Sequence, residues 1–166
     1  LIVTGSSAGN GMVLRVDANA PIRFSTGGNA TSNIRMTILG TGAVGIGTDT
    51  PQKNLHIEGD GGASASQLLV TGASDTVGST AGILLRAEGG EADSALRAKG
   101  AIFFEREAGS FGTGKMHLAV NGAQSNVSVT LAEAALTIDD NRNVGIGDTS
   151  PEGKFDVVDG NAKMIF

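Results

Sequence analysis

Residues 44–51 read VGIGTDTP and residues 144–151 read VGIGDTSP, so one short motif occurs twice with a spacing of 100 residues. Self-similarity at a fixed spacing indicates a fold built from repeated structural units. Each copy combines two β-branched residues, two glycines and a proline. These positions are Val44, Gly45, Ile46, Gly47 and Pro51 in the first copy, and Val144, Gly145, Ile146, Gly147 and Pro151 in the second.

The segments around the motif alternate apolar and other side chains with a period of two. Residues 34–38 (IRMTI) and 134–138 (AALTI) precede it, and residues 55–57 (LHI) and 155–157 (FDV) follow it. This period predicts short β-strands with one apolar face, which we expect to point inward. The glycines of the motif fall on the other face, where a side chain would meet a turn or a closely approaching backbone. The residues leading to each proline are expected to form turns.

Weaker matches link other parts of the chain. Residues 1–5 (LIVTG) match residues 68–72 (LLVTG), and both are expected to be short strands. Two further matches pair residues 12–15 with 83–86 and residues 22–24 with 102–104. Because the offset between matches grows along the chain, we predict that the second unit carries loop insertions at residues 73–82, 87–101 and roughly 105–125. A short helix over residues 91–99 is an alternative for part of the second insertion.

These matches divide the chain into repeated units. We predict a first β-repeat unit over residues 1–67, a second over residues 68–163, and the start of a truncated third over residues 164–166. The chain begins at Leu1, and we expect it to be part of a longer protein.

The composition limits the core and the partners that this chain can have. Glycine makes up 26 of 166 residues, tryptophan, tyrosine and cysteine are absent, and phenylalanine supplies the six aromatic residues. Since 40% of the residues are hydrophobic, we expect the chain to be ordered. Its core should form from many small aliphatic residues that pack across chain boundaries. The net charge of −5 and the scattered basic residues argue against nucleic-acid binding. No apolar run reaches the roughly 20 residues of a membrane helix, so we expect no membrane insertion.

Two glycine-rich stretches resemble nucleotide-binding loops. Residues 40–45 (GTGAVG) fit G-x-G-x-x-G, and residues 1–11 fit the T-G-x-x-x-G-x-G turn of short-chain dehydrogenases. Such loops work by presenting backbone N–H groups at the start of a helix, and no helical pattern follows either stretch. The catalytic tyrosine of those dehydrogenases is also missing. We therefore predict no dinucleotide site and no cofactor.

Two acidic segments have features of functional sites. Glu105 and Glu107 would share one strand face, as the carboxylate pair of a glycoside hydrolase does, but the aromatic platforms of sugar sites are missing. We expect a solvated charged edge there. The segment Asp139–Asn143 begins like a calcium loop but continues with the wrong residues for an EF-hand, so we expect a turn.

His56 and His117 have no second histidine or cysteine at the spacing of metal ligands. We therefore predict no metal site, and we expect both to be ordinary surface histidines.

The motif and its flanks carry a resemblance to a known family. Residues 143–157 (NVGIGDTSPEGKFDV) look like the N-V-G-I-G-T-x-x-P-x-x-K-L-x-V repeats of bacteriophage tail fibres and tailspikes, which often precede an intramolecular chaperone domain. Residues 43–57 match as well, departing at Ala43 and Asn54, where the family has Asn and Lys. No chaperone domain and no catalytic motif of that family can be carried over to this chain.

The resemblance implies an all-β, elongated repeat fibre of short strands, of the intertwined triple β-helix or β-prism type, assembled as a homotrimer. It implies a place in the virion tail fibre or another extracellular appendage, with other virion tail proteins and a host surface glycan or receptor as partners. The inserted loops near residues 73–125 are the expected host-contacting surface, with Phe111 and Lys115 as candidate residues.

We therefore predict a non-enzymatic structural protein that forms a trimeric shaft with projecting loops. Two alternatives remain at this point. One is a carbohydrate-processing segment of a tailspike, and the other is a bacterial extracellular adhesin or fibre built from similar repeats.

Overall fold

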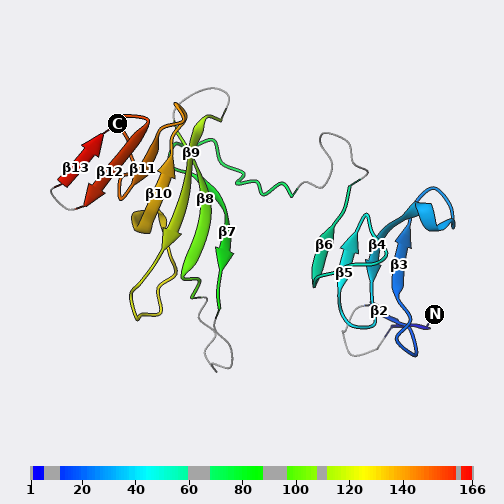
Figure 1. The fold of residues 1–166 in the computed structure, drawn as a ribbon. Helices are drawn as coiled ribbons and strands as arrows, with labels where there is room; N and C mark the ends of the chain where they lie inside the picture. The colour runs from blue at the N-terminus through cyan, green and yellow to red at the C-terminus, as the bar shows by residue number, and fades with distance from the viewer. Residues whose placement is uncertain are drawn as a thin grey trace. The chain divides into compact units, whose positions relative to one another are not determined.

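A computed structural model describes residues 2–5, 12–59, 68–87, 97–107, 112–159 and 162–165 of the chain (Figure 1). The described part is made of β-strands and two short 3-10 turns, without an α-helix, so the prediction of an all-β protein is confirmed. The chain divides into two compact units, Leu1–Leu69 and Val70–Phe166, which we call unit one and unit two.

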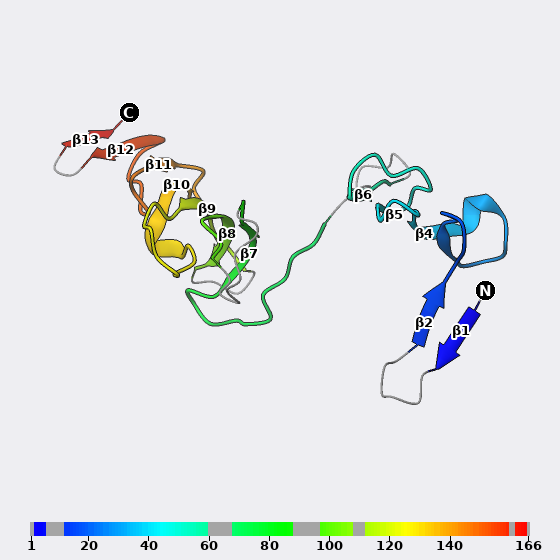
Figure 2. The ribbon, with the colours of Figure 1, turned by 90° about the horizontal axis from the view of Figure 1, so that it is seen from below.

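Unit one contains a β-hairpin and a four-stranded mixed sheet. The sheet has the order β3-β4-β5-β6, with β5 and β6 parallel and the other pairs antiparallel. The hairpin of β1 and β2 forms a separate antiparallel pair, which Figure 2 shows clearly. The elements are β1 (Ile2–Gly5), β2 (Met12–Arg15), β3 (Ile22–Ser25), η1 (Thr31–Asn33), β4 (Ile34–Ile38), β5 (Val44–Ile46) and β6 (Leu55–Ile57).

Unit two is one seven-stranded mixed sheet with the order β13-β12-β11-β10-β9-β8-β7. Strands β11 and β12 are parallel, and every other neighbouring pair is antiparallel. The elements are β7 (Thr80–Leu85), β8 (Gly100–Arg106), β9 (Gly114–Val120), η2 (Leu131–Glu133), β10 (Ala134–Ile138), β11 (Val144–Ile146), β12 (Phe155–Asp159) and β13 (Ala162–Ile165).

The spacing of 100 residues is reproduced in the structure. Strands β4 and β10, and likewise β5 and β11, begin and end 100 residues apart, and η1 and η2 do the same. The registers repeat too, since Thr37 faces Gly45 in unit one and Thr137 faces Gly145 in unit two. The sequence repeat is therefore a structural repeat, residue for residue, around the motif.

The glycines of the motif are explained by contacts that recur in both units. A Cβ on Gly45 or Gly145 would fall on the carbonyl oxygen of Thr48 or Asp148, because the following turn folds back over the strand. Gly147 has a φ of +68° and faces the carbonyl oxygen of Val158 in β12. The prediction that these positions meet a turn or an approaching backbone is confirmed.

The predicted turns after the motif are also present. In each unit a side-chain oxygen of the turn accepts a hydrogen bond from the backbone N–H two residues on, Thr50 N to Thr48 Oγ1 at 3.4 Å and Ser150 N to Asp148 Oδ1 at 2.8 Å. These hydrogen bonds stabilise the turn that leads from one parallel strand to the next.

Three expectations about unit two are wrong. Residues 68–70 form no strand, and the region predicted as a third insertion holds strand β9. Strand β9 is also the counterpart of β3, because both pair with the strand before the motif and carry the same register shift. The extra length of unit two therefore lies partly before β9 and partly after it, since residues 121–130 separate β9 from η2 whereas residues 26–30 separate β3 from η1. The alternative helix over residues 91–99 falls mostly outside the described residues.

The two faces of each sheet are covered to different extents within one chain. The face with the glycines is the covered one, since Thr37, Thr137 and Asp156 are fully buried on it. The small core of unit two lies on the same face and consists of Ala101, Phe103, Ala119 and Val129, with Leu131 of η2 packed against it. The aliphatic face, which the sequence analysis expects to be buried across chain boundaries, is left largely exposed within one chain.

Candidate functional sites

The aliphatic face of unit two forms two continuous rows across six strands, and we call it apolar face two. Cross-strand registers define one row of Ile83, Ile102, Leu118, Leu136, Ile146 and Val157, and another of Ala81, Phe104, Met116, Ile138, Val144 and Phe155. Neither row contains a polar or charged side chain. Most of the large members are exposed, for example Leu118 at 46% and Met116 at 48%. Contiguous apolar surface of this kind marks an interaction site in soluble proteins.

Unit one has the same surface on its smaller sheet, which we call apolar face one. Its rows are Phe24, Met36, Ile46 and Ile57, and Ile22, Ile38, Val44 and Leu55. Phe24, Ile46 and Leu55 are exposed. The sequence repeat has therefore kept an uncharged apolar face in both units, whereas the covered faces behind them differ in composition.

The covered face of unit two contains a polar network that joins three strands. The His117 side chain, only 1% exposed, lies with Nδ1 3.1 Å from Thr137 Oγ1 and Nε2 3.1 Å from Glu105 Oε2. A carboxylate, an imidazole and a hydroxyl in this order also occur in nucleophilic enzymes. Here the hydroxyl of Thr137 is fully buried, so no substrate can reach it, and the network ties β8, β9 and β10 together. The expectation that His117 lies on the surface is wrong.

Other candidate residues from the sequence lie near this network. Glu107 forms an ion pair with Lys115, 2.6 Å between Oε1 and Nζ, so the two candidate carboxylates are each held by a basic side chain. Lys115 lies in β9 rather than in a loop. Phe111 lies outside the described residues.

The predicted turn at residues 139–143 is confirmed. Asn143 N donates to Asp139 Oδ1 at 2.7 Å, and Arg142 adopts a φ of +63°. Among the described residues, no cluster of acidic or histidine side chains is arranged to hold a metal ion.

His56 occupies the position that Asp156 has in the other unit. Its Nδ1 atom accepts from Gln52 N at 3.5 Å, as Asp156 Oδ2 accepts from Glu152 N at 3.1 Å. His56 is half-buried and lies on the face with Gly45, so it supports the turn between the parallel strands.

A capping box closes η2 in unit two. Thr130 N donates to Glu133 Oε2 at 2.7 Å, and Ala132 N donates to Thr130 Oγ1 at 3.2 Å. The backbone hydrogen bond from Thr130, with a second from its hydroxyl, lowers the pKa of Glu133 below its ordinary value of 4.5. The matching turn η1 of unit one has no side-chain cap.

This cap makes the stability of unit two depend on pH. Because the folded pKa of Glu133 is the lower one, its contribution is complete above pH 4.5 and is lost as the pH falls through the folded pKa. We expect Glu133→Gln to lower the denaturant midpoint at pH 7, and the difference from wild type to shrink on acidification. Glu58→Gln removes one exposed negative charge and serves as the control. A difference that stays constant from pH 7 to pH 3 would argue against the assignment.

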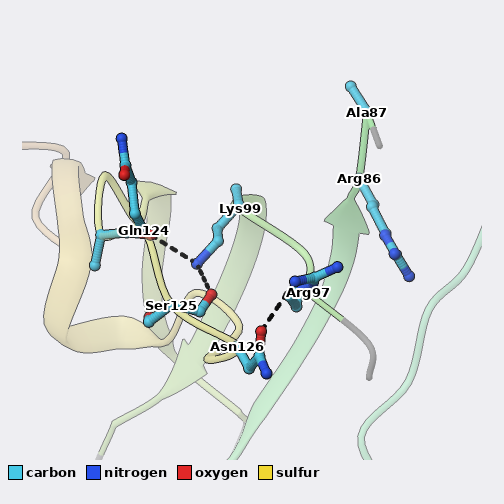
Figure 3. Close-up of a pocket in the computed structure, with 8 residues that line it drawn as sticks. Arg86, Ala87, Arg97, Lys99, Gln124, Ser125 and Asn126 are labelled. Carbon is cyan, nitrogen blue, oxygen red and sulfur yellow. Dashed lines mark hydrogen bonds between the residues drawn. The ribbon is translucent and has the colours of Figure 1, made fainter. Parts of the chain in front are cut away.

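A basic pocket lies at the edge of the sheet of unit two, beside the ends of β7 and β8 (Figure 3). It has a volume of about 600 Å³ and is lined by Arg86, Ala87, Arg97, Lys99, Ala123, Gln124, Ser125 and Asn126. Figure 3 shows Lys99 directed at the backbone of the 123–127 loop and Arg97 directed at Asn126. Sequence reasoning missed this pocket because its residues come from three separate segments.

Lys99 organises the loop that forms one wall of the pocket. Its Nζ donates to three carbonyl oxygens, those of Ala123 and Ser125 at 3.0 Å and of Val127 at 2.8 Å. Arg97 Nη1 adds a bond to Asn126 Oδ1 at 2.9 Å. One ammonium group thus satisfies three loop carbonyls.

We expect Lys99→Met to release this loop, because methionine keeps the apolar stem of the side chain but has no donor. Losing charged hydrogen bonds should cost about 1–3 kcal/mol of unfolding free energy. In limited proteolysis, an unspecific protease should cut the variant within residues 122–128 about ten times faster than wild type. The increase follows from the same loss of free energy, because the loop opens more often. Lys154→Met is the matched control, since Lys154 Nζ donates to a single carbonyl, that of Asn141. Equal cleavage of the two variants would contradict the role of Lys99.

Comparison with known proteins leaves these surfaces as the main guide to function. No family model matches the sequence, and no curated protein is significantly similar to it. Among the described residues, no helix is long and apolar enough to cross a membrane.

Proposed function

We propose that this chain is a structural repeat segment of a homotrimeric fibre, of the kind found in bacteriophage tail fibres, whose chains associate through apolar faces one and two. The observation that carries the proposal is the recurrence of an uncharged, exposed apolar face at equivalent positions of both units. A second copy of the chain is the occupant, because an identical partner brings an equally uncharged apolar face, and closed assemblies of identical chains are the commonest oligomers.

The energetics favour association. Burying one large aliphatic side chain contributes roughly 1.5–3 kcal/mol, and apolar face two alone exposes Ile83, Ile102, Phe104, Met116, Leu118, Ile138, Ile146 and Phe155. This exceeds what the small core of one chain provides, since that core holds two alanines, a phenylalanine and a valine. Assembly is therefore expected to add to the stability of the fold, as contacts between neighbouring units do in repeat proteins.

The chain path supports an intertwined fibre. In each unit two parallel strands are joined by eight residues, 47–54 or 147–154, which is fewer than the dozen usually needed for a parallel crossover. Winding β-repeats are the folds in which consecutive strands run parallel through such short turns. The proposal also includes threefold symmetry, a place in the virion and attachment to other tail proteins. These three points rest on the sequence resemblance.

The arrangement around Glu105 and Glu107 supports a structural rather than a catalytic role. Both carboxylates are engaged by basic side chains of the same sheet, and the network of His117 is closed to substrate. A glycan-processing function has no such observation in its favour.

The mass of the native particle tests the proposal. Sedimentation equilibrium and light scattering should give three times the chain mass of 16.6 kDa. A stable monomer would overturn the proposal, and a dimer would overturn its threefold symmetry. Turnover of a capsular glycan that disappears in Glu105→Gln or Glu107→Gln would overturn the structural role itself.

A further inference from the structure

The repeated sheet has two edges that are occupied in unit two and open in unit one. Strands β3 to β6 of unit one correspond to β9 to β12 of unit two. In unit two, β8 pairs with the outer edge of β9, and β13 pairs with the outer edge of β12. Among the described residues of unit one, β3 pairs only with β4, and β6 pairs only with β5 (Figure 1). The repeat therefore accepts a strand on both sides, and unit one presents both places unfilled.

The part of the chain that the structure describes offers no strand of its own for these places. The hairpin of β1 and β2 forms a separate pair, and residues 68–70, which follow β6 along the chain, form no strand. In unit two only residues 160–161 separate β12 from β13, and their sequence, Gly-Asn, is typical of a hairpin turn. Ten residues, 58–67, separate β6 from residue 68 in unit one. A local hairpin is thus favoured in unit two alone.

The two open edges of unit one belong to strands that run in the same direction. Strand β3 is antiparallel to β4, β4 is antiparallel to β5, and β5 is parallel to β6. A rotation about an axis along the strands keeps their direction, so β6 of one copy can pair with β3 of the next copy as a parallel neighbour. Because the two edges differ from each other, three copies use each edge once and close a ring.

This pairing continues both rows of apolar face one from one copy into the next. The rows begin on β3 at Phe24 and Ile22, and they end on β6 at Ile57 and Leu55. When Leu55 is placed beside Ile22 of the next copy, Ile57 falls beside Phe24 on the same face, because side chains alternate with a period of two. The apolar rows therefore meet without a break in this alignment.

The charges at the two edges are complementary. Arg23 is the charged residue of β3, Glu58 directly follows β6, and both side chains are exposed. In the same alignment they are diagonal neighbours across the junction, at a separation that long side chains can span. An exposed ion pair contributes little stability, but it favours this alignment over others that bring like charges together.

The width of the sheet suits a ring of three. Its four strands, at a spacing of about 4.8 Å, make it about 19 Å wide. Three flat sheets of this width enclose a triangular space whose sides lie about 5.5 Å from the axis, roughly half of the ~10 Å between two packed sheets. The aliphatic side chains of apolar face one can therefore fill the interior.

We propose that the edge of β6 in one copy pairs with the edge of β3 in the next, so that the unit-one sheets of three copies close into a ring around apolar face one. The proposal rests on the fibre function, and it names the strands that join the chains. Since β3 has four residues and β6 has three, each junction is short, and it forms together with the burial of apolar face one.

Cysteine cross-linking of the assembled protein tests this pairing, because the chain has no cysteine of its own. In the double variant Ser25→Cys with Glu58→Cys both positions are exposed, and the two thiols should meet across each junction. Within one chain they lie three strand spacings, about 14 Å, apart. Dibromobimane, which bridges only neighbouring thiols, should therefore give covalent dimers and trimers on a denaturing gel. The pair Ile22→Cys with Leu55→Cys repeats the test at the other end of the junction.

Two controls and the particle mass decide the outcome. Each single-cysteine variant should remain a monomer on the denaturing gel. The pair Ile22→Cys with Glu58→Cys is out of register by three residues, about 10 Å, and should hardly cross-link. If the particle is a trimer and neither matched pair cross-links more than the controls do, the edge pairing is rejected and the fibre proposal stands. A monomeric particle rejects both.

Discussion

Leu118→Glu is expected to convert the homotrimer into folded monomers. Leu118 lies in the middle of apolar face two, between Ile102 on β8 and Leu136 on β10. In one chain the side chain is already 46% exposed, so a glutamate there can reach water and the monomer can keep its sheet. In the assembly the carboxylate would be buried among aliphatic side chains and near its symmetry copies, which costs several kcal/mol. Association should weaken by about a hundredfold or more, and sedimentation velocity measures it.

A control separates this effect from a general effect of charge. Val77 is 64% exposed but lies in the turn before β7, outside the apolar rows, and Val77→Glu should leave the particle mass unchanged. Met116→Glu in the neighbouring row should act like Leu118→Glu. Circular dichroism of each variant reports whether the sheet persists. A Leu118→Glu protein that remains trimeric with native dichroism would show that apolar face two is not the interface.

The repeat around the motif could be predicted from the sequence because its determinants are local. The alternation of residues 34–38 and 134–138 defines strands, and the glycines and prolines define the turn between parallel strands. Each of these signals acts within a few residues of the element it forms. The prediction therefore held for β4 to β6 and for β10 to β12 in type and in place.

Which face is covered could not be predicted in the same way. Alternation shows that Val44 and Ile46 share a face, but it does not show what lies over the other one. The turn at Thr48 covers Gly45 directly, and in unit two Val129 and Leu131 close over the same face. The loop that returns across each strand decides which face is covered within one chain, and the path of that loop does not follow from the alternation.

Strand β9 had a local signal that was missed. Residues 115–120 (KMHLAV) alternate in the manner of a half-buried strand, yet the match of residues 22–24 to residues 102–104 assigned its place to an insertion. The contacts of His117 then depend on the registers of β8 and β10, which bring Glu105 and Thr137 to it from 12 and 20 residues away. Contacts between residues this far apart in the sequence can be predicted only when the strand order and registers of the sheet are known.

The glycines of the second motif should be among the positions least tolerant of a side chain. In Gly147→Ala the new Cβ would fall on the carbonyl oxygen of Val158 while the backbone keeps a φ of +68°. In Gly145→Ala the Cβ would meet the carbonyl oxygen of Asp148. Backbone must move in both cases, so we expect each to lower the unfolding free energy by about 3–5 kcal/mol, near the upper end for single substitutions.

Two other glycines of unit two distinguish the effect of the close backbone contact from the effect of backbone strain. Gly122 has open space and no positive φ, so Gly122→Ala should change stability by less than about 0.5 kcal/mol. Gly78 also has open space but a φ of +85°, so Gly78→Ala should cost about 1–2 kcal/mol from backbone strain alone. Urea denaturation at one protein concentration ranks the four variants. If Gly145→Ala proved no worse than Gly122→Ala, the turn would not lie over the strand, and the motif would owe its glycines to something other than this close approach of backbone.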